Sequence, residues 1–139
     1  MDTNEAQRYA EVIADEVREL EAALVRIYEG YGRDEVSADF DGTTFTDPMD
    51  LVAHYVNFVA LSVEDVSART YGENAYEARR SVEVLRTYGG PSAYVDFDGD
   101  GGATVRVYWG SDRGRVSVYA PGVDAELWEW MDALAAVEA

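Results

Sequence analysis

The chain has 139 residues, no cysteine and a formal net charge of −17, from 28 acidic and 11 basic residues. This length fits a single domain, residues 1–139, that buries a core without disulfides, and the missing cysteines exclude a thiolate nucleophile and cysteine-ligated zinc. No apolar run approaches the length of a membrane span, and the first residues lack the basic and apolar regions of a secretory leader, so a soluble cytoplasmic protein is expected.

The choice of charged residues indicates the salt concentration in which the protein works. All 11 basic residues are arginine, and lysine is absent. A chain this acidic repels itself in dilute buffer, but at molar salt the Debye length falls to about 3 Å and most of the repulsion disappears. The composition resembles that of cytoplasmic proteins from extreme halophiles. The alternative is an acidic mimic of nucleic acid that binds a basic protein, although the acidic residues do not follow phosphate spacing.

The first element in the chain is a helix over residues 4–29. Apolar residues recur there at intervals of three and four, and Gly30 and Gly32 end the pattern. The predicted buried stripe consists of Tyr9, Val12, Ile13, Val17, Leu20, Leu24, Ile27 and Tyr28.

A second helix follows an irregular segment or short hairpin that turns at Gly42. Asp47 is predicted to cap this helix, with Pro48 at its first position. The only histidine, His54, is interpreted as a packed or rim residue. The predicted buried stripe is Leu51, Val52, Tyr55, Phe58, Val59 and Val63.

The second half of the chain changes to a period of two. Alternation around residues 94–97, 104–109 and 115–119, with glycine-rich turns between, predicts antiparallel strands. Residues 73–88 fit a helix or a strand, with a strand favoured for 80–88, and residues 66–71 could supply a fifth. A helix over 124–137 closes the chain, with the stripe Leu127, Trp130, Met131 and Leu134 and with Trp128 to its side.

These elements predict an α+β fold. An antiparallel sheet of four or five strands carries an N-terminal helical pair and a C-terminal helix packed on one face. Residues 1–60 have a net charge of −10, residues 61–119 only −2, and residues 120–139 −5. The helices therefore carry most of the negative charge, and the sheet is nearly neutral.

One face of the sheet is the candidate binding surface. Alternation turns valines, Phe97 and Trp109 to one side, and tyrosine and arginine to the other. Tyrosine and arginine are enriched at the energetic centres of interfaces. The candidate binding residues are Tyr94, Arg106, Tyr108, Arg115 and Tyr119.

The segment "DFDGDG" at residues 96–101 has the start of a calcium loop. Asp96, Asp98 and Asp100 occupy ligand positions, and Gly101 occupies the position of the sharp turn. Val107 stands where a bidentate glutamate would complete the shell. The spacing thus indicates a glycine-rich hairpin turn, with a weak cation site as the alternative.

The segment "DFDGTTFTDPMDLV", residues 39–52, resembles the first motif of the haloacid-dehalogenase phosphatases. The resemblance covers about a dozen residues. It implies a magnesium-dependent phosphatase in which Asp39 is the nucleophile and Asp41 the general acid and base. That family places the motif after an apolar strand of a parallel sheet, whereas "RDEVSA" precedes it here.

The function expected from these observations is a non-enzymatic protein-interaction domain of a halophile. It would bind a protein partner or form a homodimer. No cofactor, no membrane association and no direct binding to nucleic acid are expected. The phosphatase and the nucleic-acid mimic remain the alternatives.

The charge predicts that the fold requires salt. We expect native circular dichroism in molar potassium chloride and loss of it near 50 mM salt, roughly where screening becomes weak between neighbouring charges. A full native spectrum in the dilute buffer would contradict the halophilic interpretation.

Overall fold

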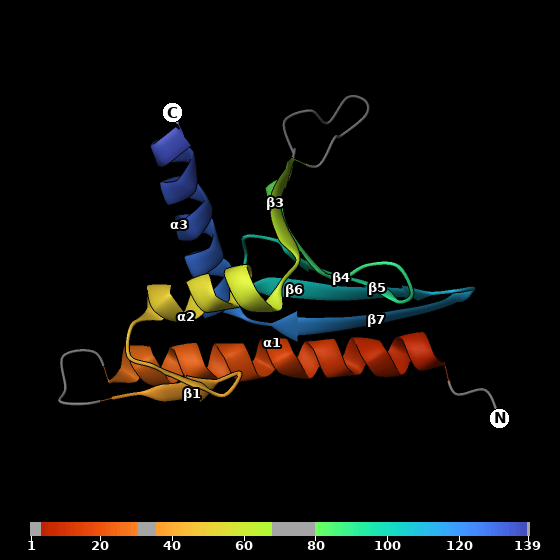
Figure 1. The fold of residues 1–139 in the computed structure, drawn as a ribbon, viewed down its shortest axis with the longest axis horizontal. Coiled ribbons are helices and arrows are strands. Elements are labelled where there is room, and N and C mark those ends of the chain that lie inside the picture. Colours follow the sequence, from red (N-terminus) through yellow and green to blue (C-terminus); the bar gives the residue numbers. More distant parts are fainter. Residues whose placement is uncertain (1–3, 31–35, 68–79, 139) are drawn as a thin grey trace.

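The computed structural model describes residues 4–30, 36–67 and 80–138 (Figure 1). Helices and antiparallel strands confirm the α+β class. None of the helices in these ranges has the length and hydropathy needed to traverse a bilayer. The elements are α1 (Glu5–Glu29), β1 (Ala38–Phe40), β2 (Thr43–Phe45), α2 (Pro48–His54), the π-helical turn η1 (Tyr55–Val59), β3 (Ser62–Ser67), β4 (Arg80–Thr87), β5 (Ser92–Phe97), β6 (Gly102–Trp109), β7 (Asp112–Tyr119) and α3 (Pro121–Glu138).

Strands β3 to β7 form one antiparallel meander, in which each strand pairs with the next along the chain. Strand β4 confirms the strand favoured for 80–88. The additional strand expected at 66–71 is β3, which begins earlier, at Ser62. The chain passes from η1 directly into the sheet, where the Leu61 amide donates to the Leu85 carbonyl at 2.8 Å. The helical alternative for 73–88 is wrong over residues 80–87, which form β4. Residues 68–71 and 73–79 lie outside the described residues.

Helix α1 packs along β6 and β7, and its buried stripe forms the centre of a single hydrophobic core. The stripe contains four alanines that the predicted stripe omitted. Val12 is 62% exposed and Tyr28 is 41% exposed, so their assignment to the buried stripe is wrong. Small residues bring the helix close to the sheet, and a Cβ at Gly114 would lie 2.2 Å from the Ala6 carbonyl oxygen. The buried residues of α1 are Ala6, Ala10, Ile13, Ala14, Val17, Leu20, Ala23, Leu24 and Ile27.

The start of α1 also protects the free edge of the sheet. The Gln7 side-chain amide accepts from the Arg115 backbone N–H at 2.9 Å and donates to the Arg115 carbonyl at 3.0 Å. Asn4 caps α1 by accepting from the Gln7 backbone N–H, and its own amide donates to the Arg113 carbonyl at 3.0 Å. These side chains occupy backbone groups of β7 that would otherwise be open to another strand.

Helix α2 begins as expected, with the Asp47 carboxylate accepting from the Met49 backbone N–H and Pro48 at the first position. Its continuation differs, because residues Tyr55–Val59 form a π-helical turn closed by the bond from the Ala60 amide to the Tyr55 carbonyl. A π turn shifts the side-chain register. Tyr55 is buried as predicted, but Phe58 is 77% exposed, which corrects its assignment to the buried stripe.

Two further assignments change at element ends. Val63 lies on β3 and is only partly buried, so it does not extend the stripe of α2. Trp109 is on the predicted side of β6 but is 38% exposed, because it lies at the last residue of the strand, where it packs edge-on against Tyr9 at 6.0 Å between ring centroids.

Helix α3 begins at Pro121, three residues before the expected start. Glu21 of α1 supplies its N-terminal cap, because the carboxylate accepts from the backbone N–H groups of Gly122 at 3.1 Å and Val123 at 2.8 Å. Leu127 is buried and Trp128, Trp130 and Met131 are partly buried against the core, while the side chain of Leu134 lies outside the described set.

Asp124 joins α3 to the turn between β5 and β6. It is 1% exposed, and its two carboxylate oxygens accept from the backbone N–H groups of Gly99 at 3.2 Å and Gly101 at 2.8 Å. Both glycines have positive φ, which other residues rarely adopt. Burial raises the pKa of Asp124, and the two backbone donors offset part of that shift.

We expect Asp124→Ala to lower the free energy of unfolding by about 2–3 kcal/mol, since it leaves two backbone donors without their charged acceptor. Denaturant titration in molar salt measures the change. The control is Asp132→Ala, an exposed carboxylate on the same helix, for which a change within about 0.5 kcal/mol is expected. Equal effects of the two substitutions would show that the Asp124 contacts are unimportant.

Candidate functional site

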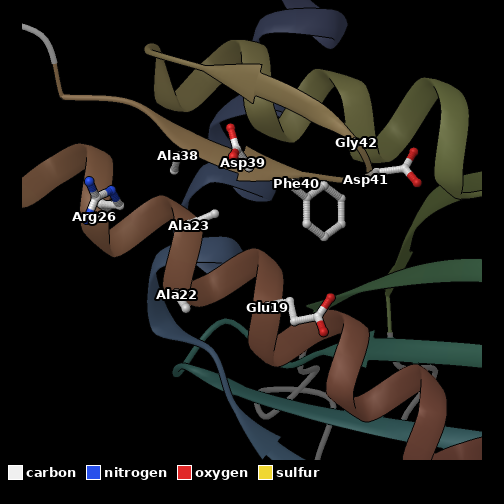
Figure 2. A pocket seen from close by; sticks show the side chains of 9 residues that line it. All are labelled: Glu19, Ala22, Ala23, Arg26, Ala38, Asp39, Phe40, Asp41 and Gly42. Atoms are coloured by element: carbon white, nitrogen blue, oxygen red, sulfur yellow. The ribbon is translucent and has the colours of Figure 1, made fainter.

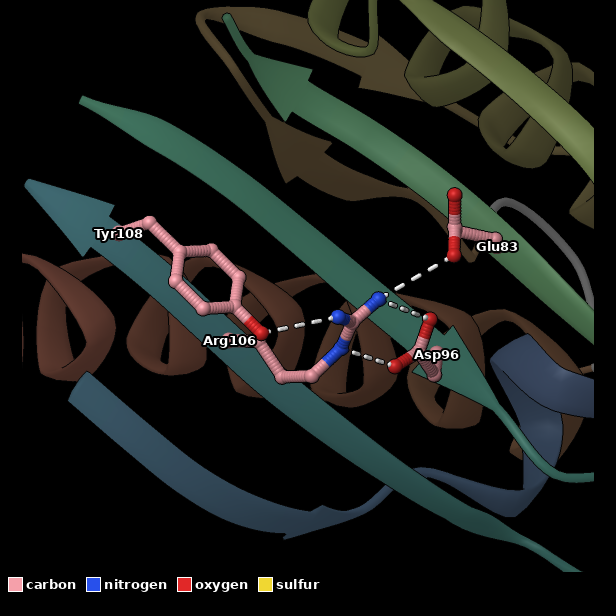
Figure 3. Close-up of polar contacts among 4 residues, drawn as sticks. All are labelled: Glu83, Asp96, Arg106 and Tyr108. Carbon is pink, nitrogen blue, oxygen red and sulfur yellow. Dashed lines mark hydrogen bonds and ion pairs between the residues drawn. The ribbon is translucent and has the colours of Figure 1, made fainter. Parts of the chain in front are cut away.

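The face of the five-stranded sheet opposite α1 carries the predicted binding residues. We call it the outer face, and Figure 3 shows part of it with α1 behind the strands. The strand register places Glu64, Glu83, Asp96, Thr104 and Ser117 in one row across it. A second row contains Leu85, Tyr94, Arg106 and Arg115. Tyr108, Arg113 and Tyr119 also lie on the outer face.

Arg106 is the centre of a polar network on this face (Figure 3). Its guanidinium donates to both carboxylate oxygens of Asp96, at 2.6 and 3.2 Å, and to Glu83 at 3.2 Å. A third nitrogen donates to the Tyr108 hydroxyl at 3.2 Å, and the guanidinium carbon lies 4.9 Å from the centre of the Tyr94 ring. A bidentate, stacked guanidinium has a fixed orientation, so the face is organised before any partner arrives.

The electrostatics of the network are unbalanced. Burial raises the pKa of Glu83, and the neighbouring Asp96 carboxylate raises it further, while Arg106 lowers it. The hydrogen bond that Arg106 donates to Asp96 is the main reason that the pKa of Arg106 is raised. Glu64 also raises the pKa of Glu83. The side of the outer face on β3, β4 and β5 thus holds three carboxylates, of which Glu83 and Asp96 pair with Arg106 of β6.

The opposite side of the outer face, on β6 and β7, is basic and aromatic. Arg113 and Arg115 are exposed, and neither makes an ion pair within the part of the chain that the structure describes. Arg113 lies 5.8 Å from the centre of the Tyr108 ring. Tyr108 is 38% exposed and Tyr119 is 76% exposed. The two halves of the outer face therefore differ in the sign of their charge.

The structure brings four of the five predicted binding residues together. Tyr94, Arg106 and Arg115 are cross-strand neighbours, and Tyr108 contacts both Arg106 and Tyr94. Tyr119 lies apart, at the end of β7 opposite Gly102. Sequence reasoning missed Glu64 and Glu83. Their positions follow from alternation on β3 and β4, but only once the register with β5 is known.

The possible cation ligands in the turn between β5 and β6 are separated by their other contacts. Asp96 binds Arg106 on the outer face. One oxygen of Asp98 accepts from the backbone N–H groups of Asp100 and Gly102, as in a turn held by its own aspartate. Among the described residues, no three side chains of histidine, cysteine, aspartate or glutamate are grouped to hold a metal ion.

The segment that resembles the phosphatase motif forms a hairpin. Asp39 lies on β1 and accepts from the Thr44 hydroxyl at 2.6 Å, while Asp41 and Gly42 form the turn with positive φ. The β1–β2 pair and all other strand pairs in the described sheets are antiparallel, whereas the resemblance implies a motif following a parallel strand. The structural context that this chemistry requires is therefore absent from the described residues.

Between this hairpin and α1 is a cavity of about 390 Å³ (Figure 2). Phe40 points towards α1, and Asp39 lies on the opposite side of the strand. The Asp41 carboxylate contacts His54 Nε2 at 3.0 Å, and the His54 ring lies among Phe40, Phe45 and Phe58. His54 thus has the packed position expected from the sequence, and the two aspartates do not converge on one point.

Comparisons of the chain with protein-family models, curated proteins and solved structures found no match. The function is therefore inferred from the geometry of its own residues.

We expect Arg106→Ala to lower the free energy of unfolding by about 1–3 kcal/mol at neutral pH, since Glu83 and Asp96 would then face each other without a cation. The loss should shrink as the pH falls. A carboxyl group whose folded pKa is raised favours the fold when protonated, and that contribution is lost as the pH rises through the folded pKa.

Denaturant titrations between about pH 5 and pH 8 measure this dependence. Arg18→Ala is the matched control, because Arg18 forms an exposed ion pair with Asp15 and should change stability by less than about 0.5 kcal/mol at every pH. A pH-independent loss for Arg106→Ala would contradict the proposed electrostatics.

Proposed function

We propose that the chain is a non-enzymatic protein-interaction domain that pairs with a second copy of itself through the outer face. The observation that carries this proposal is the division of the outer face into an acidic half and a basic half. Glu64 and Glu83 lie on β3 and β4, while Arg113 and Arg115 lie on β7. The setting we propose is the salt-rich cytoplasm of a halophile.

The division of charge makes the outer face complementary to itself. A two-fold axis in the plane of contact, parallel to β5, would place the acidic half of one copy on the basic half of the other. Such an interface uses the same surface on both copies and closes at a dimer. Sheets that pack face to face in this way lie about 10 Å apart, within reach of the tyrosine and arginine side chains.

The residue types on the outer face suit burial in an interface between two copies. Tyr108 and Tyr119 offer aromatic area together with a hydroxyl group that can find a partner. The network around Arg106 holds the centre of the face in one arrangement, so little side-chain freedom is lost on contact. With −17 on each copy, long-range repulsion opposes pairing in dilute buffer, and screening by salt removes it.

Charge reversal tests the pairing. We expect sedimentation velocity in molar potassium chloride to show a wild-type dimer and Arg115→Glu to raise its dissociation constant by about ten-fold or more. Glu64→Arg should do the same. The double variant should recover the dimer, because the axis places Glu64 of one copy over β7 of the other, one row from Arg115 and within reach of its long side chain.

Arg8→Glu is the matched control, as it makes the same change on an exposed residue of α1, on the other side of the sheet. It should leave the dimer intact. A monomeric wild type at high protein concentration would refute the proposal, as would single and double variants that all dissociate equally while keeping native circular dichroism.

A further inference from the structure

A second cavity, of about 560 Å³, lies where the three helices meet. The end of α1, the start of α2 and the middle of α3 form its walls, away from the outer face. This volume is within the range of small-molecule sites. The lining residues are Tyr28, Asp47, Pro48, Met49, Glu126 and Glu129.

Glu126 is the unusual member of this lining. It is 8% exposed, and it makes no hydrogen bond or ion pair with any residue in the described ranges. Its carboxylate oxygens are not fully enclosed and open into the cavity. The loss of part of its hydration without a pairing group still disfavours the charged form. Burial raises the pKa of Glu126, and Glu129 raises it further. The cavity therefore contains a negative group whose counter-charge the described chain does not supply.

The other walls indicate what kind of cation fits. Asp47 uses one oxygen to cap α2, and Glu129 is exposed. The three carboxylates are not grouped closely enough to hold a metal ion among the described residues. Tyr28, Pro48 and Met49 place apolar surface in the same cavity. Separated negative charges with apolar surface between them match a ligand whose positive charges are separated by methylene groups.

We propose that this cavity binds an aliphatic amine with two or more ammonium groups. One ammonium group pairs with Glu126, and another reaches Glu129 or Asp47. The methylene chain lies against Met49 and Pro48, and the Tyr28 ring offers a face to a cation. Binding neutralises the buried carboxylate, which gives the site a gain that an exposed acidic patch lacks.

Titration calorimetry with spermidine as the probe tests the site, in the lowest potassium chloride concentration that keeps native circular dichroism. We expect saturable binding to the wild type. Glu126→Gln, which keeps the volume of the side chain, should weaken it by about ten-fold or more. Without spermidine the same variant should melt at a higher temperature than the wild type, because it removes a partly dehydrated carboxylate that also lies near Glu129.

Glu19→Gln is the matched control, since Glu19 is an exposed carboxylate that lines the cavity between α1 and β1. It should change the affinity by less than about two-fold, and magnesium at equal ionic strength should not replace spermidine. The proposal fails if binding does not saturate, if both variants weaken it equally, or if magnesium competes fully. It also fails if Glu126→Gln lowers the melting temperature.

Discussion

The packing of α1 across β6 and β7 is the contact on which the rest of the structure depends. The helix covers the inner face of the sheet, and its alanines and Gly114 allow the close approach. The same helix shields the β7 edge through Gln7, caps α3 through Glu21 and pairs with β4 through Glu16 and Arg86. Because α1 packs on one side only, the opposite side of the sheet keeps its tyrosines and arginines in contact with solvent.

Charge is distributed according to this arrangement. Helical segments carry most of the −17, whereas the sheet region is close to neutral and pairs its carboxylates with arginine. Carboxylates that are partly removed from water thus occur in two settings, on the outer face and in the cavity at Glu126. On the outer face the Arg106 guanidinium of β6 pairs with both Asp96 and Glu83. In the cavity no described residue does so, and a ligand can take that place.

Local patterns predicted much of this fold, and long-range register explains what they did not predict. The helical period over 4–29, the Asp47 cap and the alternation in β5 to β7 each depend on neighbouring residues, and each was confirmed. The π turn that exposes Phe58 has no local signature, since its residues also suit an α-helix. The Arg106 network joins β4, β5 and β6, so Glu83 could be recognised only after the strands were aligned.

The position of α1 also governs the order in which the chain can fold during synthesis. Asn4 at the start of the helix bonds to Arg113, 109 residues later. The strands that cover the apolar stripe of α1 are therefore synthesised long after the helix itself. Contacts this distant in sequence close slowly. The apolar stripe of α1 therefore stays uncovered until β6 and β7 have been made, and acidic residues on the other sides of the helix oppose its aggregation during that interval.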